Sequence, residues 1–556
     1  MPRGPALWRK SYPAGLSPEA ELAAHPVQRI VDEGARRWGG QPAFVFRGNV
    51  LAYDELQAEA DRCAAAFVRA GVAKGNRVAL LLPNTLYHPI AFFGAMKAGA
   101  TVVHLSPLDS EKVLNHKLSD SGARLLVTTN VGDLAIRARR LLDAGHVDRM
   151  VVGEDAAYGP SPLAGPLPGD DDRISSFAEF VDGAGPGELP RVAADDLALL
   201  QYTGGTTGLP KGAMLTHRNL SSAVSAYDLW FAAHGLTRPG LDRVLLFLPL
   251  FHIYALTAVM LRALNNGLEL RLHTRFDAET ALAEIEAGAT SFPAVPTMWI
   301  AIAATPGFED RDLSSLRYCA SGGAPLPVEI ARKLRAATGR DILGGWGMTE
   351  TSPAGTNIPP GRPDKMATIG VPLPGIHLDI VALDDPSRIL PTGEVGELRV
   401  FGPNVTCGYL NRGEESGAAF SDGGFLTGDI GYMDEEGFFT IVDRKKDMII
   451  CGGFNVYPQM IEQAIYEHPS IEEVLVIGIP DGYRGEAPKA FVKLRTGAES
   501  PTLEELRLFL KSRLGPHEMP SALEIREALP RTPVGKLSKL ELKKEEAERR
   551  DVAKVS

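Results

Sequence analysis

The strongest constraint on the fold is the alternation of short apolar runs with amphipathic segments through most of residues 1–350. One repeat consists of an apolar run at 77–82, a helical pattern at 87–98 and a second apolar run at 101–105. This is the rhythm of βαβ units, in which helices cover parallel strands. Further strand-like runs are found at 124–128, 149–152, 197–202, 243–248, 268–273 and 316–320. We therefore predict an α/β fold with helix-covered, mostly parallel sheets in a large N-terminal domain.

The 556 residues exceed what one hydrophobic core supports, so more than one domain is expected. Residues 154–195 are rich in Gly, Pro and Asp, which predicts an exposed connector rather than a domain boundary. Shorter strands with frequent glycine predict a small β-rich subdomain over about 365–442. A smaller α/β pattern follows the charged cluster at 443–447. We predict a large domain over 1–443 and a smaller, mobile α+β C-terminal domain over 444–556.

Composition is that of an ordinary globular protein, with 44% hydrophobic and 23% charged residues. A net charge of −11 argues against nucleic acid and against an anionic membrane as the main partner. Cysteines 63, 319, 407 and 451 lack the spacing of a zinc site or a disulfide framework, and no signal-peptide pattern opens the sequence. A cytosolic location is therefore expected.

Two long uncharged windows, 78–96 and 244–261, approach the length of a membrane span. Each contains proline and histidine at the point where a strand would turn into a helix. We therefore predict a buried strand, a turn and a buried helix in both windows.

A loop with the composition of a phosphate site follows the apolar run at 197–202. Residues 202–212 read Tyr-Thr-Gly-Gly-Thr-Thr-Gly-Leu-Pro-Lys-Gly. Glycines allow backbone N–H groups to turn towards one anion, and threonine hydroxyls and Lys211 add donors and a positive charge. Pro210 precedes Lys211, so the Walker order Gly-Lys-Ser/Thr is absent and the P-loop of kinases and GTPases is disfavoured. The loop predicts nucleotide binding; a surface turn without a function is the alternative.

Four other segments place polar groups beside glycine turns. Glu350 closes Trp-Gly-Met-Thr-Glu after a predicted strand, which makes it a candidate magnesium ligand. Asp429 in Thr-Gly-Asp is suited to ribose hydroxyls, Arg444 lies near the expected domain junction, and Lys536 lies on a Gly/Pro loop. Each has a structural alternative: a helix N-terminal acid, a turn cap, a surface ion pair and an exposed lysine, respectively.

Found together in this order, these motifs resemble the adenylate-forming superfamily of acyl-CoA synthetases, nonribosomal adenylation domains and firefly luciferases. The resemblance covers nearly the whole chain. The matching segments are 51–56, 96–100, 202–212, 248–254, 321–325, 346–350, 427–429, 443–447 and 533–536. Within the superfamily the sequence is most similar to bacterial long-chain fatty-acid CoA ligases. Two departures are Trp346, where tyrosine is usual, and Glu518, where lysine is common.

The resemblance implies an ATP-dependent, AMP-forming ligase that works in two half-reactions. The acid attacks the α-phosphate of ATP in the presence of Mg2+ to give acyl-AMP and pyrophosphate, and the thiol of CoA then displaces AMP. The implied catalytic residues are Lys536, Glu350, His252 and Thr349, with Glu350 also holding the metal. Lys446 is the implied hinge, and Gly452 and Gly453 line the implied CoA channel. The implied nucleotide-binding residues are Thr203, Gly204, Gly205, Thr206, Thr207, Gly208, Lys211, Gly323, Ala324, Pro325, Trp346, Gly347, Asp429 and Arg444.

The implied acyl pocket is lined by Phe251, His252, Tyr254, Arg262, Met298 and Trp299. Ordinary core packing is the alternative for each of them except His252, the implied aromatic gate. A tunnel of Leu, Val and Ala side chains would suit an alkyl chain, whose burial is worth about 0.8 kcal/mol per methylene. Arg262 interrupts an otherwise apolar stretch. If Arg262 points into the tunnel, the expected substrate is a dicarboxylate such as pimelate. If Arg262 points to solvent, the expected substrate is a fatty acid.

The leading prediction is a cytosolic ligase of medium- to long-chain fatty acids, with at most peripheral contact with the inner membrane. Ligases of this type are often homodimers. A dicarboxylate or aromatic-acid ligase is one alternative, and an enzyme that supplies a carrier protein instead of CoA is another. A non-catalytic nucleotide-binding regulator is an alternative of a different class, against which the joint presence of Glu350, Asp429, Arg444 and Lys536 argues.

Overall fold

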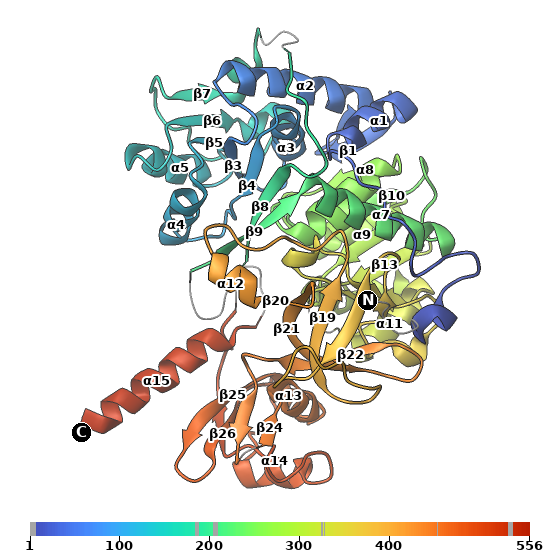
Figure 1. The fold of residues 1–556 in the computed structure, drawn as a ribbon, viewed down its shortest axis with the longest axis vertical. Coiled ribbons are helices and arrows are strands. Elements are labelled where there is room, and N and C mark those ends of the chain that lie inside the picture. The colour runs from blue at the N-terminus through green and yellow to red at the C-terminus, as the bar shows by residue number, and fades with distance from the viewer. Residues whose placement is uncertain are drawn as a thin grey trace. The chain divides into compact units, whose positions relative to one another are not determined.

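The computed structural model describes residues 7–183, 188–203, 209–323, 326, 328–452, 454–531 and 537–555, and its helices and strands are drawn in Figure 1. The chain divides into two compact units. The first is drawn from residues 1–378, 400–425 and 436–438, and the second from residues 379–399, 426–435 and 439–556. The boundary predicted between residues 443 and 444 lies within strand β22 (Phe439–Arg444).

Two seven-stranded sheets form the centre of the first unit, with strand orders β7-β6-β5-β3-β4-β8-β9 and β14-β13-β12-β10-β11-β1-β2. Neighbouring strands pair in parallel except β8 with β9 and β1 with β2. The strands of the first sheet are β3 (Arg77–Leu81), β4 (Thr101–His104), β5 (Leu125–Thr129), β6 (Arg149–Gly153), β7 (Ile174–Ser176), β8 (Leu197–Thr203) and β9 (Lys211–Thr216). Those of the second are β1 (Pro42–Phe46), β2 (Asn49–Ala52), β10 (Arg243–Leu246), β11 (Glu269–Leu272), β12 (Ser291–Ala294), β13 (Tyr318–Ser321) and β14 (Ile342–Leu343).

Helices cover both faces of these sheets. The longer ones are α1 (Arg29–Trp38), α2 (Tyr53–Arg69), α3 (Tyr87–Lys97), α4 (Glu111–Ser121), α5 (Leu134–Asp143), α7 (His217–Ala233), α9 (Ala278–Glu286), α10 (Pro296–Ala304) and α11 (Val328–Thr338). In β3, Val78 and Leu80 join the core shared with α2 and α3, whereas Ala79 and Leu81 face α4 and α5. Because successive side chains of a strand point to opposite faces, a strand covered on both sides is apolar throughout. The predicted α/β fold is confirmed.

Both uncharged windows fold as the sequence predicts. Residues 78–96 form most of β3 and α3, and residues 244–261 form most of β10 followed by a π-helix, η3 (Tyr254–Leu261). Within the described ranges, none of the helices combines the length and the apolar character needed to cross a membrane.

The prediction of an exposed connector over residues 154–195 missed a 3-10 helix, η2 (Asp155–Tyr158), and two further elements. Strand β7 pairs in parallel with β6, and helix α6 (Phe177–Val181) follows it directly. Ser176 caps this helix and accepts a hydrogen bond from the N–H of Glu179. An edge strand of three residues, Ile-Ser-Ser, is too short and too polar to stand out from a Gly/Pro-rich sequence.

Smaller sheets follow along the chain. In the first unit, β15 (Gly345–Trp346), β16 (Thr356–Asn357) and β17 (Val371–Pro372) form an antiparallel sheet. Between residues 377 and 444 the chain forms β18 (His377–Val381), β19 (Gly396–Phe401), α12 (Gly413–Ala418), β20 (Phe420–Ser421), β21 (Gly424–Met433) and β22.

After β22 the second unit forms an α/β layer of its own. Its strands β23 (Ile449–Cys451), β24 (Phe454–Val456), β25 (Ile471–Asp481), β26 (Gly485–Leu494) and β27 (Ala522–Ile525) share one sheet. Its helices are α13 (Pro458–Tyr466), α14 (Leu503–Leu510) and α15 (Lys539–Val555). Apolar side chains of α13 and α14 pack on the sheet and form the core of this part.

Candidate active site

Glu350 lies in a short 3-10 turn, Thr349–Thr351, directly after β15 in the first unit. Its side chain is 5% exposed, and the phenol of Tyr409 donates a hydrogen bond of 2.8 Å to its Oε1. The backbone N–H of Thr406 donates to the carbonyl of Glu350 at 2.7 Å. The carboxylate is therefore buried, fixed in position and supplied with a donor from a distant part of the chain.

Tyr409 also connects Glu350 to the phosphate-loop region. It forms a β-bridge with Ala213 of strand β9, and its ring lies 5.6 Å from Nζ of Lys211. Lys211 forms an ion pair with Glu415. Burial and the neighbouring Glu350 raise the pKa of the Tyr409 phenol, so it remains a proton donor. The structure thus brings two predicted residues, Lys211 and Glu350, to one tyrosine.

Thr203 ends β8 and pairs with Lys211, the first residue of β9. β8 and β9 are therefore the two strands of a hairpin. Thr203 is the last residue before the predicted phosphate loop, and Lys211 is the first residue of the strand after it. The loop residues Gly204, Gly205, Thr206, Thr207 and Gly208 lie outside the described residues.

Trp346 is buried at the end of β15, and its backbone N–H donates to Oγ1 of Thr356 at 3.1 Å. Two glycines near Trp346, Gly347 and Gly355, are positions at which a side chain would not fit. A Cβ on Gly355 would lie 2.5 Å from the Trp346 ring, and one on Gly347 would lie 1.4 Å from the carbonyl oxygen of Pro353. Only glycine permits this close approach of the two segments.

His252 and Tyr254 precede and begin the π-helix η3. The N–H of Tyr254 donates to Nδ1 of His252 at 3.3 Å, and the carbonyl of Phe251 accepts from Nε2 of Gln201 at 3.0 Å. A Cβ on Gly322 would lie 3.2 Å from the ring of Tyr254, so the ring lies beside the predicted nucleotide segment. Gly323 of that segment has a φ of +82°. Ala324 and Pro325 lie outside the described residues.

The other predicted acyl-pocket residues lie on helices. Trp299 of α10 is buried in the core below the second sheet, and its Nε1 donates to the carbonyl of Ala320 at 2.9 Å. Met298 is partly buried against the same core. Arg262 begins α8 (Arg262–Asn265) and is 3% exposed, so it does not point to solvent.

Asp429 and Arg444 of the second unit face each other across the antiparallel strands β21 and β22 and form an ion pair. Asp429 is 1% exposed, and its N–H donates to Oγ1 of Thr427 at 3.1 Å. The Arg444 side chain is 45% exposed. The buried carboxylate of Asp429 is thus paired with the guanidinium of Arg444, which is accessible to solvent.

Lys446 follows β22 at a turn in which the N–H groups of Asp447 and Met448 both donate to the carbonyl of Arg444. Burial and the charge of Arg444 lower the pKa of Lys446. Gly452 has a φ of +60°, and its N–H donates to the carbonyl of Arg484 at 2.7 Å. Gly453 and Lys536 lie outside the described residues.

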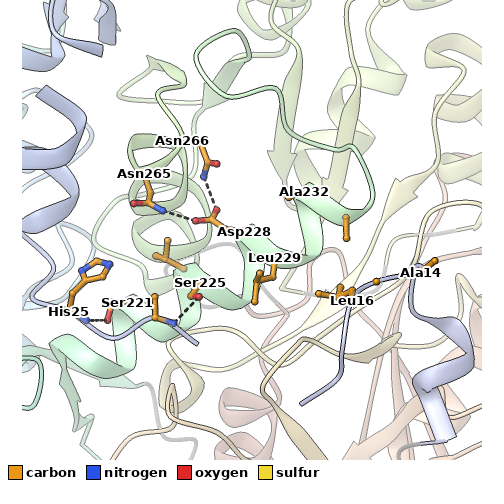
Figure 2. Close-up of a pocket in the computed structure, with 14 residues that line it drawn as sticks. Ala14, Leu16, His25, Ser221, Ser225, Asp228, Leu229, Ala232, Asn265 and Asn266 are labelled. Atoms are coloured by element: carbon orange, nitrogen blue, oxygen red, sulfur yellow. Dashed lines mark hydrogen bonds between the residues drawn. The ribbon is translucent and has the colours of Figure 1, made fainter. Parts of the chain in front are cut away.

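A hollow of about 530 Å³ lies elsewhere in the first unit, beside the middle of helix α7 (Figure 2). His25, Ser225, Asp228, Leu229 and Asn265 are among its lining residues. The part of its wall that the structure describes contains none of the predicted site residues. Cavity size alone therefore does not identify the reaction site of this chain.

Two residues with contacts to the predicted site, Tyr409 and Glu415, were not identified from the sequence. Tyr409 follows Gly408 in an unpatterned stretch 59 residues after Glu350. Glu415 lies in a short helix rich in glutamate and glycine. A single tyrosine or glutamate in such a sequence gives no signal of what it contacts.

Comparison with known proteins defines the class. A family model described as AMP-binding enzyme matches residues 31–410, and one described as AMP-binding enzyme C-terminal domain matches residues 460–536. The long-chain-fatty-acid–CoA ligase of Bacillus subtilis (strain 168) is 38% identical over 557 residues, which cover 97% of this chain and 98% of the relative. A feruloyl-CoA synthase of Amycolatopsis sp is 37% identical over 529 residues. The match covers 94% of this chain and 98% of that synthase.

Among solved structures, ATP-bound MatB from Rhodopseudomonas palustris has a TM-score of 0.83 and 27% identity, and the match covers 93% of this chain and 98% of MatB. The chain therefore belongs to the AMP-binding enzyme family. It is an AMP-forming acid–thiol ligase that uses ATP, Mg2+ and CoA, as the sequence predicts.

The residues around Glu350 fit a magnesium ion that is shared with a nucleotide. In the described part of the chain, no group of three or more His, Cys, Asp or Glu side chains is placed to hold a metal alone. Magnesium is commonly bound through one or two carboxylates together with substrate phosphates. Glu350 is one buried carboxylate, hydrogen-bonded to the tyrosine whose ring lies near Lys211, and one such carboxylate is a donor set that this kind of binding uses.

Proposed function

We propose that this ligase activates medium- to long-chain fatty acids. The observation that carries the proposal is helix η3, whose residues after Tyr254 are Ala-Leu-Thr-Ala-Val-Met-Leu, all buried. The helix starts beside Gly322, so its apolar side chains would form a wall that leads away from the predicted nucleotide segment. The name of the Bacillus subtilis relative supports the same substrate class. Each methylene placed against this wall would contribute about 0.8 kcal/mol.

Within the first unit, we assign Glu350 to the magnesium ion that ATP brings and Lys211 to the phosphates. Thr203, Thr349 and the loop from Gly204 to Gly208 would donate hydrogen bonds to the same phosphates. Trp346 would stack on adenine beside Gly323, Ala324, Pro325 and Gly347. Fixed donors and cations stabilise charge that grows on phosphate oxygens, because they need not reorganise during the reaction.

In the second unit, we assign Asp429 to the ribose hydroxyls, because its buried carboxylate can accept two hydrogen bonds, and Arg444 to the nucleotide. Lys536 would donate to the carboxylate and the α-phosphate as a cation. Lys446 would be the hinge, and Gly452 and Gly453 the wall of the CoA channel. These assignments follow from the family resemblance.

The test is AMP release by the full chain with ATP, Mg2+ and CoA over a panel of carboxylic acids. Octanoate, decanoate and hexadecanoate should support turnover, and short acids such as acetate should support much less. Acid-dependent exchange of labelled pyrophosphate into ATP isolates the first half-reaction. Absence of AMP with every acid would overturn the proposal.

An aromatic acid is a second candidate substrate, favoured by two observations. The feruloyl-CoA synthase is almost as similar in sequence as the fatty-acid ligase. Three tyrosines, Tyr227, Tyr254 and Tyr318, lie around the same region of the first unit. Inclusion of 4-hydroxycinnamate in the panel separates the two classes.

Cellular location and assembly belong to the same proposal. A fatty-acid ligase meets its substrate at lipid surfaces, so we propose a cytosolic enzyme with peripheral membrane contact and a homodimeric state. Sedimentation of the purified chain tests the dimer, and co-flotation with lipid vesicles tests the membrane contact.

A further inference from the structure

Arg262 is a buried cation for which the described part of the chain supplies no direct counter-ion. Its Nε donates to the carbonyl of Ala258 at 3.1 Å, and one terminal nitrogen donates to Oγ1 of Thr237 at 3.0 Å. Among the described residues, no carboxylate oxygen lies within 4 Å of its guanidinium. A guanidinium has five N–H donors, so these two contacts leave other N–H groups of Arg262 available to bind an acceptor. Buried charges are otherwise paired, because desolvation of an isolated charge is costly.

Asp228, an acidic group whose charge interacts with that of Arg262, is hydrogen-bonded to other side chains. Its Oδ2 accepts from Nδ2 of Asn265 and its Oδ1 from Nδ2 of Asn266, both at 2.7 Å, and it faces the hollow beside α7 (Figure 2). Burial raises the pKa of Asp228 to about 6, and the charge of Arg262 acts in the opposite direction. Asp228 therefore offers Arg262 a negative charge that burial weakens, and it forms no direct ion pair with it.

Aromatic side chains surround Arg262. Its guanidinium lies 4.2 Å from the centroid of the Phe231 ring, and Phe231 contacts Tyr318 edge-on at 4.8 Å. The charge of Arg262 lowers the pKa values of Tyr227, Tyr254 and Tyr318, although burial raises each of them more. Ring faces stabilise a cation only in part, and neutral phenols can donate to an anion that Arg262 binds.

This group lies at the end of the predicted acyl wall. Tyr254 and Arg262 stand eight residues apart, at the two ends of the π-helix, and the N–H of Arg262 closes an i to i−5 bond on the carbonyl of Thr257. π-helical turns are rare and are frequently found at functional sites. Tyr254 and Tyr318 are partly buried, so part of each side chain remains accessible.

We propose that Arg262 receives a second acidic group of the substrate, so that the acids activated here include α,ω-dicarboxylic acids. This inference rests on the proposed function, because it assigns the far end of the same acyl site. The near carboxylate is activated as before, and the far carboxylate pairs with the guanidinium. A fatty acid with one carboxylate would place its terminal methyl group beside the guanidinium and leave that cation unpaired.

The test compares decanedioate with decanoate, and octanedioate with octanoate, in the AMP-release assay. The wild-type chain should use each diacid with a kcat/KM at least equal to that of the matching monoacid. Arg262→Met should lower kcat/KM for the diacids on the order of 100-fold, as expected when one partner of a buried charge pair is removed. With the monoacids the same variant should change kcat/KM by less than about tenfold, so the ratio of diacid to monoacid kcat/KM should fall.

Controls separate recognition from folding. Arg262→Lys keeps the charge and should retain part of the diacid activity. Arg243→Met removes a half-exposed arginine of β10 that pairs with Glu269 and should change neither acid class. Thermal unfolding and monoacid-dependent pyrophosphate exchange report whether the Arg262→Met variant is folded.

Equal losses for both acid classes in Arg262→Met, or wild-type activity with monoacids alone, would overturn the inference and leave the proposed function intact. A selective loss of 4-hydroxycinnamate would overturn it in favour of a neutral polar group. Absence of AMP with every acid would overturn the proposed function itself, and the inference with it.

Discussion

The phenol of Tyr409 donates a hydrogen bond of 2.8 Å to Oε1 of Glu350, although the two residues lie 59 positions apart in the chain. The same tyrosine forms a β-bridge with Ala213, two residues after Lys211. Tyr409 therefore links the proposed metal ligand to the strand that carries the proposed phosphate-binding lysine. Its position predicts a role in orienting Glu350 rather than in contacting the acid.

Tyr409→Phe should weaken the use of MgATP. The change removes one hydrogen bond to a buried carboxylate and keeps the ring that faces Lys211. A hydrogen bond to a charged group contributes about 1.5–3 kcal/mol, so we expect kcat/KM for MgATP to fall by about tenfold or more. Titration of Mg2+ at fixed ATP should show a higher half-saturating concentration. Tyr483→Phe is the control, because Tyr483 is 96% exposed, and an equal effect in both variants would count against the role of Tyr409.

Gly347→Ala should disrupt the segment that carries Trp346 and Glu350. An added Cβ would lie 1.4 Å from the carbonyl oxygen of Pro353, so the backbone must move. A displacement of about 1 Å in a positioned group is expected to reduce the rate on the order of 100-fold. Pyrophosphate exchange measures this loss. Gly413→Ala is the matched control, because a Cβ there meets no heavy atom within 4 Å, and it should leave exchange unchanged.

The free energy of unfolding should fall as the pH drops from 6.5 to about 4, in part through His217. Burial lowers the pKa of His217 from 6.5 to about 4. In this window the unfolded chain binds a proton that the folded chain does not, so stability is present above the window and is lost as pH falls through it. One pKa unit corresponds to about 1.4 kcal/mol, so this site contributes about 3 kcal/mol.

His217→Asn tests that assignment. Nδ1 of His217 accepts the N–H of Val27 at 3.1 Å, and the amide oxygen of asparagine can accept in its place without titrating. Chemical denaturation at several pH values should show a shallower loss of stability in this variant. His146→Asn, in the turn after α5, is the control. An unchanged pH slope in His217→Asn would show that other groups carry the effect.

Sequence reasoning succeeded where local pattern and tertiary structure agree. Strand β3 is apolar from Val78 to Leu81 because helices cover both faces, so its position is visible in the sequence. Strand β7 was missed because an edge strand of three residues needs no apolar run. Glu350 was named as a candidate from its glycine-rich segment, whereas Tyr409 was not, because the partner of Tyr409 is set by tertiary folding alone. Arg262 was recognised as unusual, but only the structure shows that it is buried.

Lys536→Ala should abolish the first half-reaction and leave the second. The lysine is a cation near neutral pH, since its reference pKa is about 10.4. It is proposed to donate to the acid and the α-phosphate during adenylation, and loss of such a group costs on the order of 100- to 1,000-fold. Pyrophosphate exchange should be lost, while thioester formation from supplied acyl-AMP should survive. Lys544→Ala, an exposed lysine of α15, is the control. Equal loss of both half-reactions would show that the role is wrongly assigned.

Lys446→Pro should have the opposite pattern. Lys446 lies in the turn after β22, where Asp447 and Met448 both donate to the carbonyl of Arg444. A hinge needs free rotation of a few backbone angles, and proline fixes φ near −65°. The variant should therefore slow thioester formation more than pyrophosphate exchange. Lys446→Ala removes the side chain, leaves the backbone free and should keep the wild-type ratio of the two rates. Comparable losses in both half-reactions of Lys446→Pro, or the same imbalance in Lys446→Ala, would place the hinge elsewhere, because only a backbone effect distinguishes the two substitutions.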